Sequence, residues 1–195
     1  MSILESRYDG WLNKYFMPIT GRLTVVELGC GRGDDTSFLV ETGHRIVACD
    51  ISDAALAVVE QKYEDAETLR FDMLDDFPIN TDFADIVIAS LCLHFFDDRG
   101  TSKILSEIRR ILKPEGMLLC RLNSERDRLK NRPGEVFLGD GMYMTDEGIK
   151  RFYDEVLIKT VFSGWRIMFM EEKTAEKFSK TKSLWELALL PRLSG

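Results

Sequence analysis

Short apolar runs alternate along this chain with longer segments in which apolar residues recur every three or four positions. The runs predict strands at Leu23–Leu28, Arg45–Cys49, Thr68–Phe71, Ala84–Ala89, Met117–Arg121, Trp165–Met170 and Leu184–Leu190. The longer segments predict helices at Asp34–Thr42, Asp53–Glu64, Thr101–Leu112 and Asp146–Phe162. This alternation is typical of an α/β fold, in which helices cover both faces of a mostly parallel, doubly wound sheet. The last strand is expected to be antiparallel, because the final two runs can form a hairpin.

The N-terminal segment, residues 1–20, carries a helical pattern of its own before Pro18. Its apolar and largely aromatic face consists of Tyr8, Trp11, Leu12, Tyr15 and Phe16. Residues 22–192 then hold the predicted sheet and its helices, and no repeat or linker divides the chain. Because 195 residues with 45% hydrophobic content can bury one substantial core, the sequence predicts a single domain over residues 1–195.

The charge balance argues against some partners. The chain has 26 Lys and Arg residues against 33 Asp and Glu residues, a formal net charge of -7, which repels a phosphate backbone unless basic residues gather on one face. Met1–Leu12 has no apolar stretch resembling a signal sequence, and no later segment approaches the roughly 20 apolar residues of a membrane span. We therefore expect a soluble, cytoplasmic protein that binds neither nucleic acid nor membranes.

Metal-binding and disulfide signals are weak in this sequence. The chain has two histidines and no CxxC or HxxxH pair, so we expect no metal site. The cysteines lie apart, in or beside apolar runs, which favours buried thiols over disulfides; they are Cys30, Cys49, Cys92 and Cys120.

The stretch GCGRG, residues 29–33, follows the first predicted strand. Because Gly29, Gly31 and Gly33 lack a Cβ atom, the backbone here can turn sharply and lie close to a ligand. A nicotinamide fingerprint needs Gly or Ala three residues after its second glycine, but this chain has Asp34 there, followed by another aspartate. Both acids stand where a dinucleotide would set its phosphates. The turn therefore suits a ligand without phosphate.

Acidic residues also mark the first three predicted strands. Glu27 lies inside the first strand, where a buried carboxylate is costly unless something pairs with it. Asp50 ends the second strand, 21 residues after the first glycine of the turn, at the spacing where an acid accepts both hydroxyls of a ribose. Asp72 follows the third strand beside Met73, in a position suited to an adenine edge. Asp50 could instead cap the next helix, although Ser52 is better placed for that.

The chain resembles the class I S-adenosylmethionine-dependent methyltransferases in a series of stretches taken in order. They are VELGCGRG (26–33), CDIS (49–52), FDM (71–73), DIVIASLCLHFF (85–96), ILKPEGMLLCRLNS (111–124) and KSLWELALLPR (182–192). The resemblance covers about residues 22–192 and is to small stand-alone bacterial members of the family. It implies a Rossmann-like, seven-stranded fold with S-adenosyl-L-methionine as cofactor and S-adenosyl-L-homocysteine as product.

The resemblance also implies roles for single residues. The glycine turn would lie against the methionine part of the cofactor, and Glu27 would help to orient the amino acid group of that part. Asp50 would bind the ribose hydroxyls, whereas Asp72 and Met73 would meet the adenine. An aromatic residue of the N-terminal stripe, for which we take Trp11, would either cover the sulfonium by a cation–π attraction of about 0.5–2 kcal/mol or simply pack in the core. The expected cofactor-binding residues are Glu27, Gly29, Cys30, Gly31, Gly33, Asp50, Ile51, Asp72, Met73, Ser90, Leu91 and Trp11.

The acceptor side of the site is less specified. Methyl transfer mainly requires alignment, and a general base is needed only when the acceptor attacks from a protonated state. His94 follows the fourth predicted strand, where acceptor and methyl should meet, and is the candidate base; alternatively it packs at the start of the next loop. Residues 123–141 and 172–182 should border the acceptor. The second segment has four lysines against two glutamates, which predicts either a solvated loop or contact with a small anionic acceptor.

The sequence thus predicts an S-adenosylmethionine-dependent methyltransferase that acts on a small molecule. One alternative is a tellurite- or thiopurine-type detoxifying transferase, which would use a soft acceptor and need no base. Another is a noncatalytic sensor or partner protein that binds an S-adenosyl ligand. A nicotinamide reductase is disfavoured by Asp34.

Overall fold

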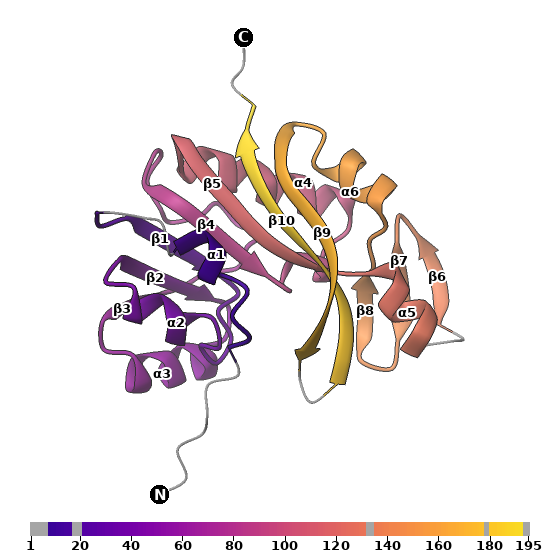
Figure 1. Ribbon diagram of the computed structural model, residues 1–195, viewed down its shortest axis with the longest axis horizontal. Helices are drawn as coiled ribbons and strands as arrows, with labels where there is room; N and C mark the ends of the chain where they lie inside the picture. Colours follow the sequence, from indigo (N-terminus) through magenta and orange to yellow (C-terminus); the bar gives the residue numbers. More distant parts are fainter. Residues whose placement is uncertain (1–7, 17–20, 132–134, 178–179, 193–195) are drawn as a thin grey trace, which may run out of the picture.

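A seven-stranded sheet crosses the protein in the order β3-β2-β1-β4-β5-β10-β9 (Figure 1). The structure, a computed structural model, describes residues 8–16, 21–131, 135–177 and 180–192. The strands are β1 (Thr24–Leu28), β2 (Arg45–Asp50), β3 (Ala66–Arg70), β4 (Ala84–Ser90), β5 (Leu112–Asn123), β9 (Trp165–Lys177) and β10 (Lys180–Pro191). β1 to β5 are parallel, and β10 is antiparallel to both of its neighbours, β5 and β9. The predicted α/β fold with an antiparallel last strand is confirmed.

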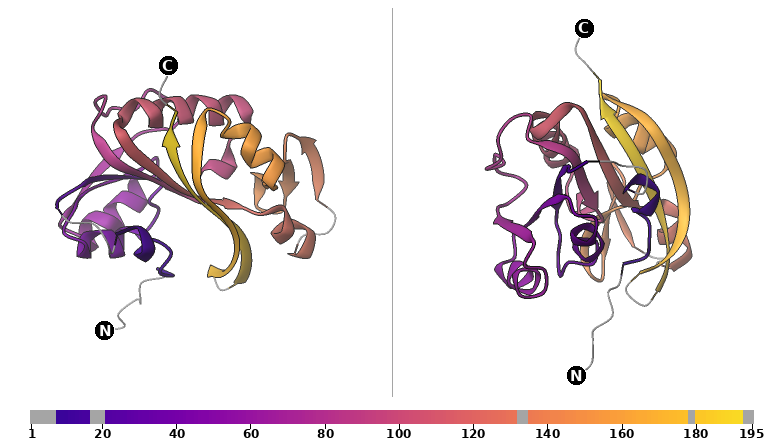
Figure 2. Two further views of the ribbon diagram at one scale, coloured as in Figure 1. Left: turned by 45° about the horizontal axis from the view of Figure 1, so that its top comes forward. Right: turned by 60° about the vertical axis from the view of Figure 1, so that its left-hand side comes forward.

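Helices cover both faces of this sheet (Figure 2). The helices over the sheet are α2 (Thr36–Glu41), α3 (Asp53–Lys62), α4 (Asp98–Ile111) and α6 (Glu155–Val161). Val25 packs with Leu39 of α2, whereas its neighbour Val26 packs with Ile104 and Ile108 of α4. Since successive side chains of a strand point to opposite faces, α2 and α4 lie on opposite sides of the sheet.

The buried strands are apolar because both of their faces are covered. Glu27 is the exception in β1 and lies on the same face as Val25. Leu28 is in register with Cys49 of β2 and Ala89 of β4, so the carboxyl ends of these strands meet at one edge. The strand order reverses between β1 and β4, which is where open α/β sheets bind their ligands.

The predicted helix over Asp146–Phe162 is wrong in its first half. The chain there forms strand β8 (Gly148–Arg151), and α6 begins only after Asp154, whose carboxylate accepts the Leu157 N–H at 2.7 Å. Arg151 at the end of β8 and the two residues before the helix cap, Phe152 and Tyr153, are all buried. Three consecutive buried side chains do not fit an amphipathic helix, which buries one stripe only.

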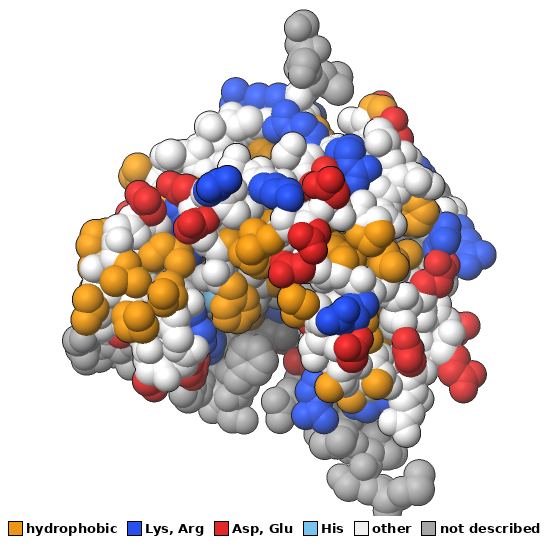
Figure 3. Space-filling model, turned by 180° about the vertical axis from the view of Figure 1, so that it is seen from behind, with side chains coloured by type: hydrophobic (Ala, Val, Ile, Leu, Met, Phe, Trp, Pro, Cys, Tyr) orange, Lys and Arg blue, Asp and Glu red, His pale blue; other side chains and the backbone are white. Residues whose placement is uncertain are grey.

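A small antiparallel sheet occupies part of the segment expected to border the acceptor. Its strands are β6 (Val136–Gly139), β7 (Met142–Thr145) and β8, and α5 (Glu125–Asn131) precedes it. Figure 3 shows hydrophobic side chains gathered at this end of the molecule. The exposed apolar residues of the small sheet are Val136, Phe137, Leu138, Met144 and Ile149. The second expected loop, 172–182, is instead largely the end of the β9–β10 hairpin.

The predicted N-terminal helix is much shorter than expected. Among the described residues 8–16, only α1 (Asn13–Phe16) is helical, and Gly10, at φ +82°, lies between Tyr8 and Trp11 of the predicted stripe. Trp11 and Leu12 are nevertheless buried, so the stripe packs on the sheet as its pattern indicates. Residues 1–7 and 17–20 of this prediction lie outside the described residues. Within the part of the chain that the structure describes, no helix is long and apolar enough to cross a membrane.

Candidate functional site

The three glycines of the turn after β1 serve three different purposes. A Cβ on Gly29, which has φ +64°, would lie 2.7 Å from Cys92 Cβ, so this glycine lets the ends of β1 and β4 approach. A Cβ on Gly33 would lie 2.7 Å from the ring of Tyr63, which makes Gly33 a packing residue beneath α3. Only Gly31, at φ +53°, would direct a Cβ into open space, with no described atom within 4 Å. Gly31 is therefore where the turn can receive a ligand.

Asp50 is held rigidly beside Gly31. Its Oδ2 accepts the Gly31 N–H at 2.9 Å, and its Oδ1 accepts the Ser52 N–H at 2.9 Å. Each carboxylate oxygen has a second lone pair, so two hydroxyl donors can still bind. The alternative role as a helix cap is wrong, because Ser52 is the cap of α3 and its Oγ accepts the Ala55 N–H at 3.2 Å.

Glu27 is a buried acid, only 3% exposed, with a hydroxyl partner but no cationic partner among the described residues. Thr36 Oγ1 donates to Glu27 Oε2 at 2.6 Å. Burial raises the pKa of Glu27 well above its usual range, and the neighbouring Asp35 carboxylate raises it further. A ligand that carries positive charge would relieve this desolvation and repulsion. S-adenosylmethionine supplies such charge in its sulfonium and ammonium groups, so the acidic surroundings of Glu27 fit it.

Replacing Glu27 with glutamine is expected to separate folding from ligand binding. Because the folded-state pKa is raised, the contribution of Glu27 to stability is fully present below its unfolded pKa of about 4.3 and is lost as pH rises through the folded value. Glu27→Gln, which still accepts from Thr36, should therefore melt at or above the wild-type temperature at pH 8, with a flatter pH profile. Its affinity for S-adenosylmethionine should fall. Melting curves at pH 5 and 8 together with calorimetry check both expectations.

Glu67→Gln is the matched control, since exposed Glu67 pairs with Arg45 at 2.7 Å and its pKa is lowered by that contact. This variant should not gain stability at pH 8 and should bind S-adenosylmethionine normally. A Glu27→Gln protein that is less stable at pH 8 and binds the ligand with unchanged affinity would remove Glu27 from the site.

The predicted adenine side lies at the ends of β2 and β3. Asp72 Oδ1 accepts the Leu74 N–H at 2.8 Å, which fixes the turn after β3. The methyl group of Met73 lies 3.8 Å from the position that a Cβ on Gly29 would take, so Met73 reaches back to the glycine turn. Ile51, beside Asp50, is 56% exposed and offers an apolar surface. The structure thus brings these predicted residues to one edge of the sheet.

The end of β4 is strained. Leu91 has φ +55°, a conformation that costs a residue other than glycine about 1–2 kcal/mol, and its N–H donates to Arg121 O at 3.0 Å.

Cys30 and Cys92 are buried, and burial raises the pKa of the Cys92 thiol to about 12 and raises that of Cys30 as well. Both thiols therefore stay protonated and are poor nucleophiles. Ser90 ends β4, and its Oγ accepts from Arg121 Nε at 3.1 Å.

His94 lies in a short 3-10 helix, η1 (Leu93–Phe95), directly after these residues. Its side chain is 7% exposed, and its ring centroid is 4.1 Å from that of Phe95. Strand β8 of the small sheet lies against η1, so the acceptor segment and the candidate base are neighbours. Arg151, at the end of β8, is fully buried; its Nη2 pairs with Asp98 and its Nε donates to Asp140 O at 2.8 Å.

One lysine of the lysine-rich segment, Lys173, is engaged in ion pairs. Lys173 pairs with Glu171 at 3.2 Å and with Glu186 at 3.1 Å, so it is balanced within the β9–β10 hairpin. Arg151 was not predicted as a site residue, because it falls inside the mistaken helix. Arg121 and Asp35 were not predicted as partners of the N-terminal segment. Trp11, expected to cover the cofactor, donates from Nε1 to Asp35 Oδ1 at 3.0 Å.

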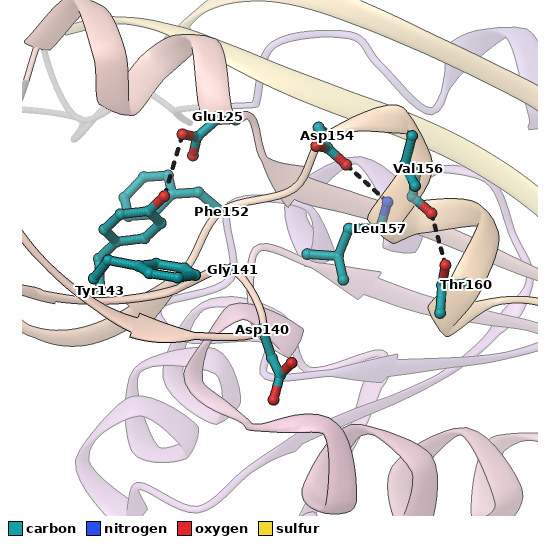
Figure 4. A pocket seen from close by; sticks show the side chains of 10 residues that line it. Glu125, Asp140, Gly141, Tyr143, Phe152, Asp154, Val156, Leu157 and Thr160 are labelled. Atoms are coloured by element: carbon teal, nitrogen blue, oxygen red, sulfur yellow. Dashed lines mark hydrogen bonds between the residues drawn. The ribbon is translucent and has the colours of Figure 1, made fainter.

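A pocket of about 370 Å³ lies between α6 and the small sheet (Figure 4). Tyr143 and Phe152 form one wall, and the Tyr143 hydroxyl donates to Glu125 Oε1 at 3.3 Å. Across the pocket, the hydrogen bonds from Leu157 N to Asp154 and from Thr160 Oγ1 to Val156 O are internal to α6 and its cap. The predicted cofactor residues do not line this pocket.

Residues 26–120 match the family described as "Methyltransferase domain". The chain is 30% identical over 118 residues to trans-aconitate 2-methyltransferase of Azoarcus sp. (strain BH72), which is 60% of this chain and 45% of that protein. It is 24% identical over 154 residues to the tRNA N(3)-cytidine methyltransferase METTL2 of Mus musculus, which is 72% of this chain and 39% of that protein. The chain therefore spans less than half the length of these two curated relatives.

Solved structures share the fold at low sequence identity. A SAM-dependent methyltransferase from Methanosarcina mazei has a TM-score of 0.79 and 15% identity, covering 94% of this chain and 98% of that one. The 1,6-didemethyltoxoflavin-N1-methyltransferase of Burkholderia thailandensis, solved with S-adenosylhomocysteine, has a TM-score of 0.67 and 15% identity, covering 87% of this chain and 71% of that one. The matched domain, the strand order and the acidic glycine turn agree in one respect: residues 26–120 are similar to a methyltransferase domain, and the chain shares the fold of S-adenosylmethionine-dependent methyltransferases.

Proposed function

We propose that this protein transfers the methyl group of S-adenosylmethionine to a small-molecule acceptor. The observation that carries the proposal is the arrangement around Gly31: an open glycine, the fixed carboxylate of Asp50 beside it and the buried acid Glu27 nearby. These groups suit a ribose and a cationic amino acid, and they are unsuited to a pyrophosphate.

The cofactor, when bound, supplies a methyl group already activated by its sulfonium. The protein's own task is then to orient and exclude water. Asp50 would hold the ribose hydroxyls, Glu27 would orient the amino acid part, and Met73 would contact the adenine. His94 would take a proton from an acceptor that attacks from a protonated state. The burial of His94 supports a water-poor site, because the imidazole itself is withdrawn from solvent.

An anionic small molecule is the acceptor class that we favour. Arg151 is fully buried, and its Nη1 has no hydrogen-bond partner among the described residues. A buried donor without an acceptor costs about 1–3 kcal/mol, which a ligand carboxylate would recover. The relatives include methyltransferases named for trans-aconitate and for tRNA. The net charge of -7 favours the former kind of acceptor over a polynucleotide.

Transfer of labelled methyl from S-adenosylmethionine to a panel of metabolites tests the proposal. The panel should hold carboxylic acids, phenols, amines, thiols and tellurite, with transfer RNA as a separate arm. We expect one small carboxylic acid to accept the label, and Arg151→Met to raise its KM about tenfold or more, as loss of a charge-assisted hydrogen bond does.

Arg109→Met is the control for this experiment, because Arg109 stacks on Trp165 at 5.1 Å from the ring centroid and lies away from the predicted site. Label found only on thiols or tellurite would favour the detoxifying alternative, and label on transfer RNA would overturn the small-molecule proposal. Tight cofactor binding without transfer to any arm would favour the noncatalytic sensor.

A further inference from the structure

Asp35 stands at the N-cap position of α2 but does not cap it. Its side chain makes no capping hydrogen bond. One carboxylate oxygen instead accepts the Trp11 indole N–H at 3.0 Å, and the other lies 3.7 Å from Arg121 Nη2. A cap is worth about 1 kcal/mol, so directing this carboxylate elsewhere has a local cost and indicates a competing role. That role joins the glycine turn to the N-terminal segment.

Arg121 is the centre of this connection. It lies on β5, is 1% exposed, and a buried guanidinium is unfavourable unless it is paired. Its Nη1 is 2.7 Å from Asp9 Oδ2, its Nε donates to Ser90, and its Cζ lies 4.6 Å from the ring centroid of Trp11. Asp9 and Trp11 thus hold the N-terminal segment against the carboxyl ends of β4 and β5.

A second ion pair of opposite polarity fixes the same segment. Glu186 of β10 is directly across from Arg121 in the sheet register, and Lys14 of α1 is 2.9 Å from it. The segment therefore offers an acid to an arginine and a lysine to a glutamate on neighbouring strands. If the partners were exchanged, Asp9 would face Glu186 and Lys14 would face Arg121, which are two pairs of like charge. The ion pairs therefore specify the orientation of the N-terminal segment on the sheet.

The connection continues into the cofactor side of the site. Asp35 holds Trp11, and the next residue, Thr36, donates to the buried Glu27. Glu27 and Asp35 repel each other, as the raised pKa of Glu27 indicates. Arg121 offsets the charge of Asp35, and a bound cationic ligand would offset that of Glu27. Closure of the segment and binding of the cofactor should therefore favour each other.

We propose that Asp9, Trp11, Asp35 and Arg121 form a clasp that positions the N-terminal segment over the glycine turn and slows release of the cofactor. Arg121 acts in this clasp as a positioning residue. The inference rests on the proposed function, since it assigns the clasp to retention of S-adenosylmethionine. The clasp predicts that breaking it changes the fluorescence of Trp11 in the ligand-free protein. It also predicts a change in the rate at which bound ligand dissociates.

Asp9→Asn is the main variant, because the Asp9 side chain is 18% exposed and its loss leaves the core intact. The fluorescence of Trp11 is the part of the emission that is lost in Trp11→Phe. In the ligand-free protein, this part should shift to longer wavelength in Asp9→Asn. Calorimetry and stopped-flow with S-adenosylhomocysteine should give a Kd about tenfold higher, through faster dissociation. Arg121→Lys should show an intermediate loss, because lysine keeps the charge without the planar fork.

Arg109→Met supplies the control, since it removes the other arginine stacked on a tryptophan, Trp165, and should change neither Trp11 emission nor dissociation. Unchanged Trp11 emission in Asp9→Asn, or a shifted emission with an unchanged dissociation rate, would overturn the clasp. A wild-type protein that binds no S-adenosylhomocysteine would contradict the proposed function itself, and the ligand-free emission separates that result from failure of the clasp.

Discussion

Replacing His94 with glutamine is expected to reduce methyl transfer about 10²- to 10⁴-fold while leaving affinity for S-adenosylhomocysteine nearly unchanged. His94 follows β4, lies in η1 against the small sheet and is withdrawn from solvent, as a base that serves a closed site should be. Glutamine preserves the hydrogen-bonding capacity but cannot take a proton. The loss should diminish at high pH, where the acceptor is already deprotonated. Turnover on the acceptor found by labelling, measured from pH 6 to 10, checks this.

The chain offers a matched control in its other histidine, His44. This side chain is 9% exposed, and its Nδ1 accepts the Leu23 N–H at 3.3 Å at the amino end of the sheet. His44→Gln should keep wild-type turnover per folded molecule. Wild-type turnover in His94→Gln as well would leave alignment as the whole mechanism and make His94 a packing residue.

Asp50→Ala is expected to weaken binding of the cofactor by about 1.5–3 kcal/mol, or roughly 10- to 150-fold in Kd, because hydrogen bonds to a charged group have that worth. The carboxylate is already oriented by the N–H groups of Gly31 and Ser52, so little entropy is lost when it binds a ribose. Calorimetry with S-adenosylhomocysteine measures the effect.

Asp53→Ala is the control for this variant, since Asp53 is a neighbouring acid at the surface that pairs with Arg70 at 2.9 Å. Its affinity for S-adenosylhomocysteine should match the wild type. A folded Asp50→Ala protein with unchanged affinity would remove Asp50 from the site and would return the carboxylate to the role of bracing the turn after β1.

The main sheet could be predicted because its signals are local. β1, β2 and β4 are mainly apolar, with Glu27 as the exception in β1, since helices cover both of their faces. α4 buries one stripe that contains Ile104, Leu105, Ile108 and Ile111. The glycine turn was predicted as one set, but its three members differ: Gly29 and Gly33 accommodate neighbouring side chains, and only Gly31 faces open space. Spacing alone does not distinguish these reasons.

Elements that depend on distant partners could not be predicted. The segment from Arg151 to Tyr153 is extended because Asp98 pairs with Arg151 and Asn123 O accepts the Tyr153 N–H, contacts that periodicity does not record. The clasp is similar, because 112 residues separate Arg121 from Asp9. In the N-terminal segment, Gly10 has a non-helical φ of +82°, which the aromatic spacing does not indicate, yet Trp11, Leu12 and Phe16 are buried.

The central claim is that the turn after β1 binds an adenosyl amino acid and not a dinucleotide. Thermal unfolding with each ligand tests it most directly. S-adenosylhomocysteine at 100 times its dissociation constant should stabilise the protein by about 2.7 kcal/mol, whereas NADH at the same concentration should leave the melting temperature unchanged. Stabilisation by NADH, with no effect of S-adenosylhomocysteine, would contradict the account.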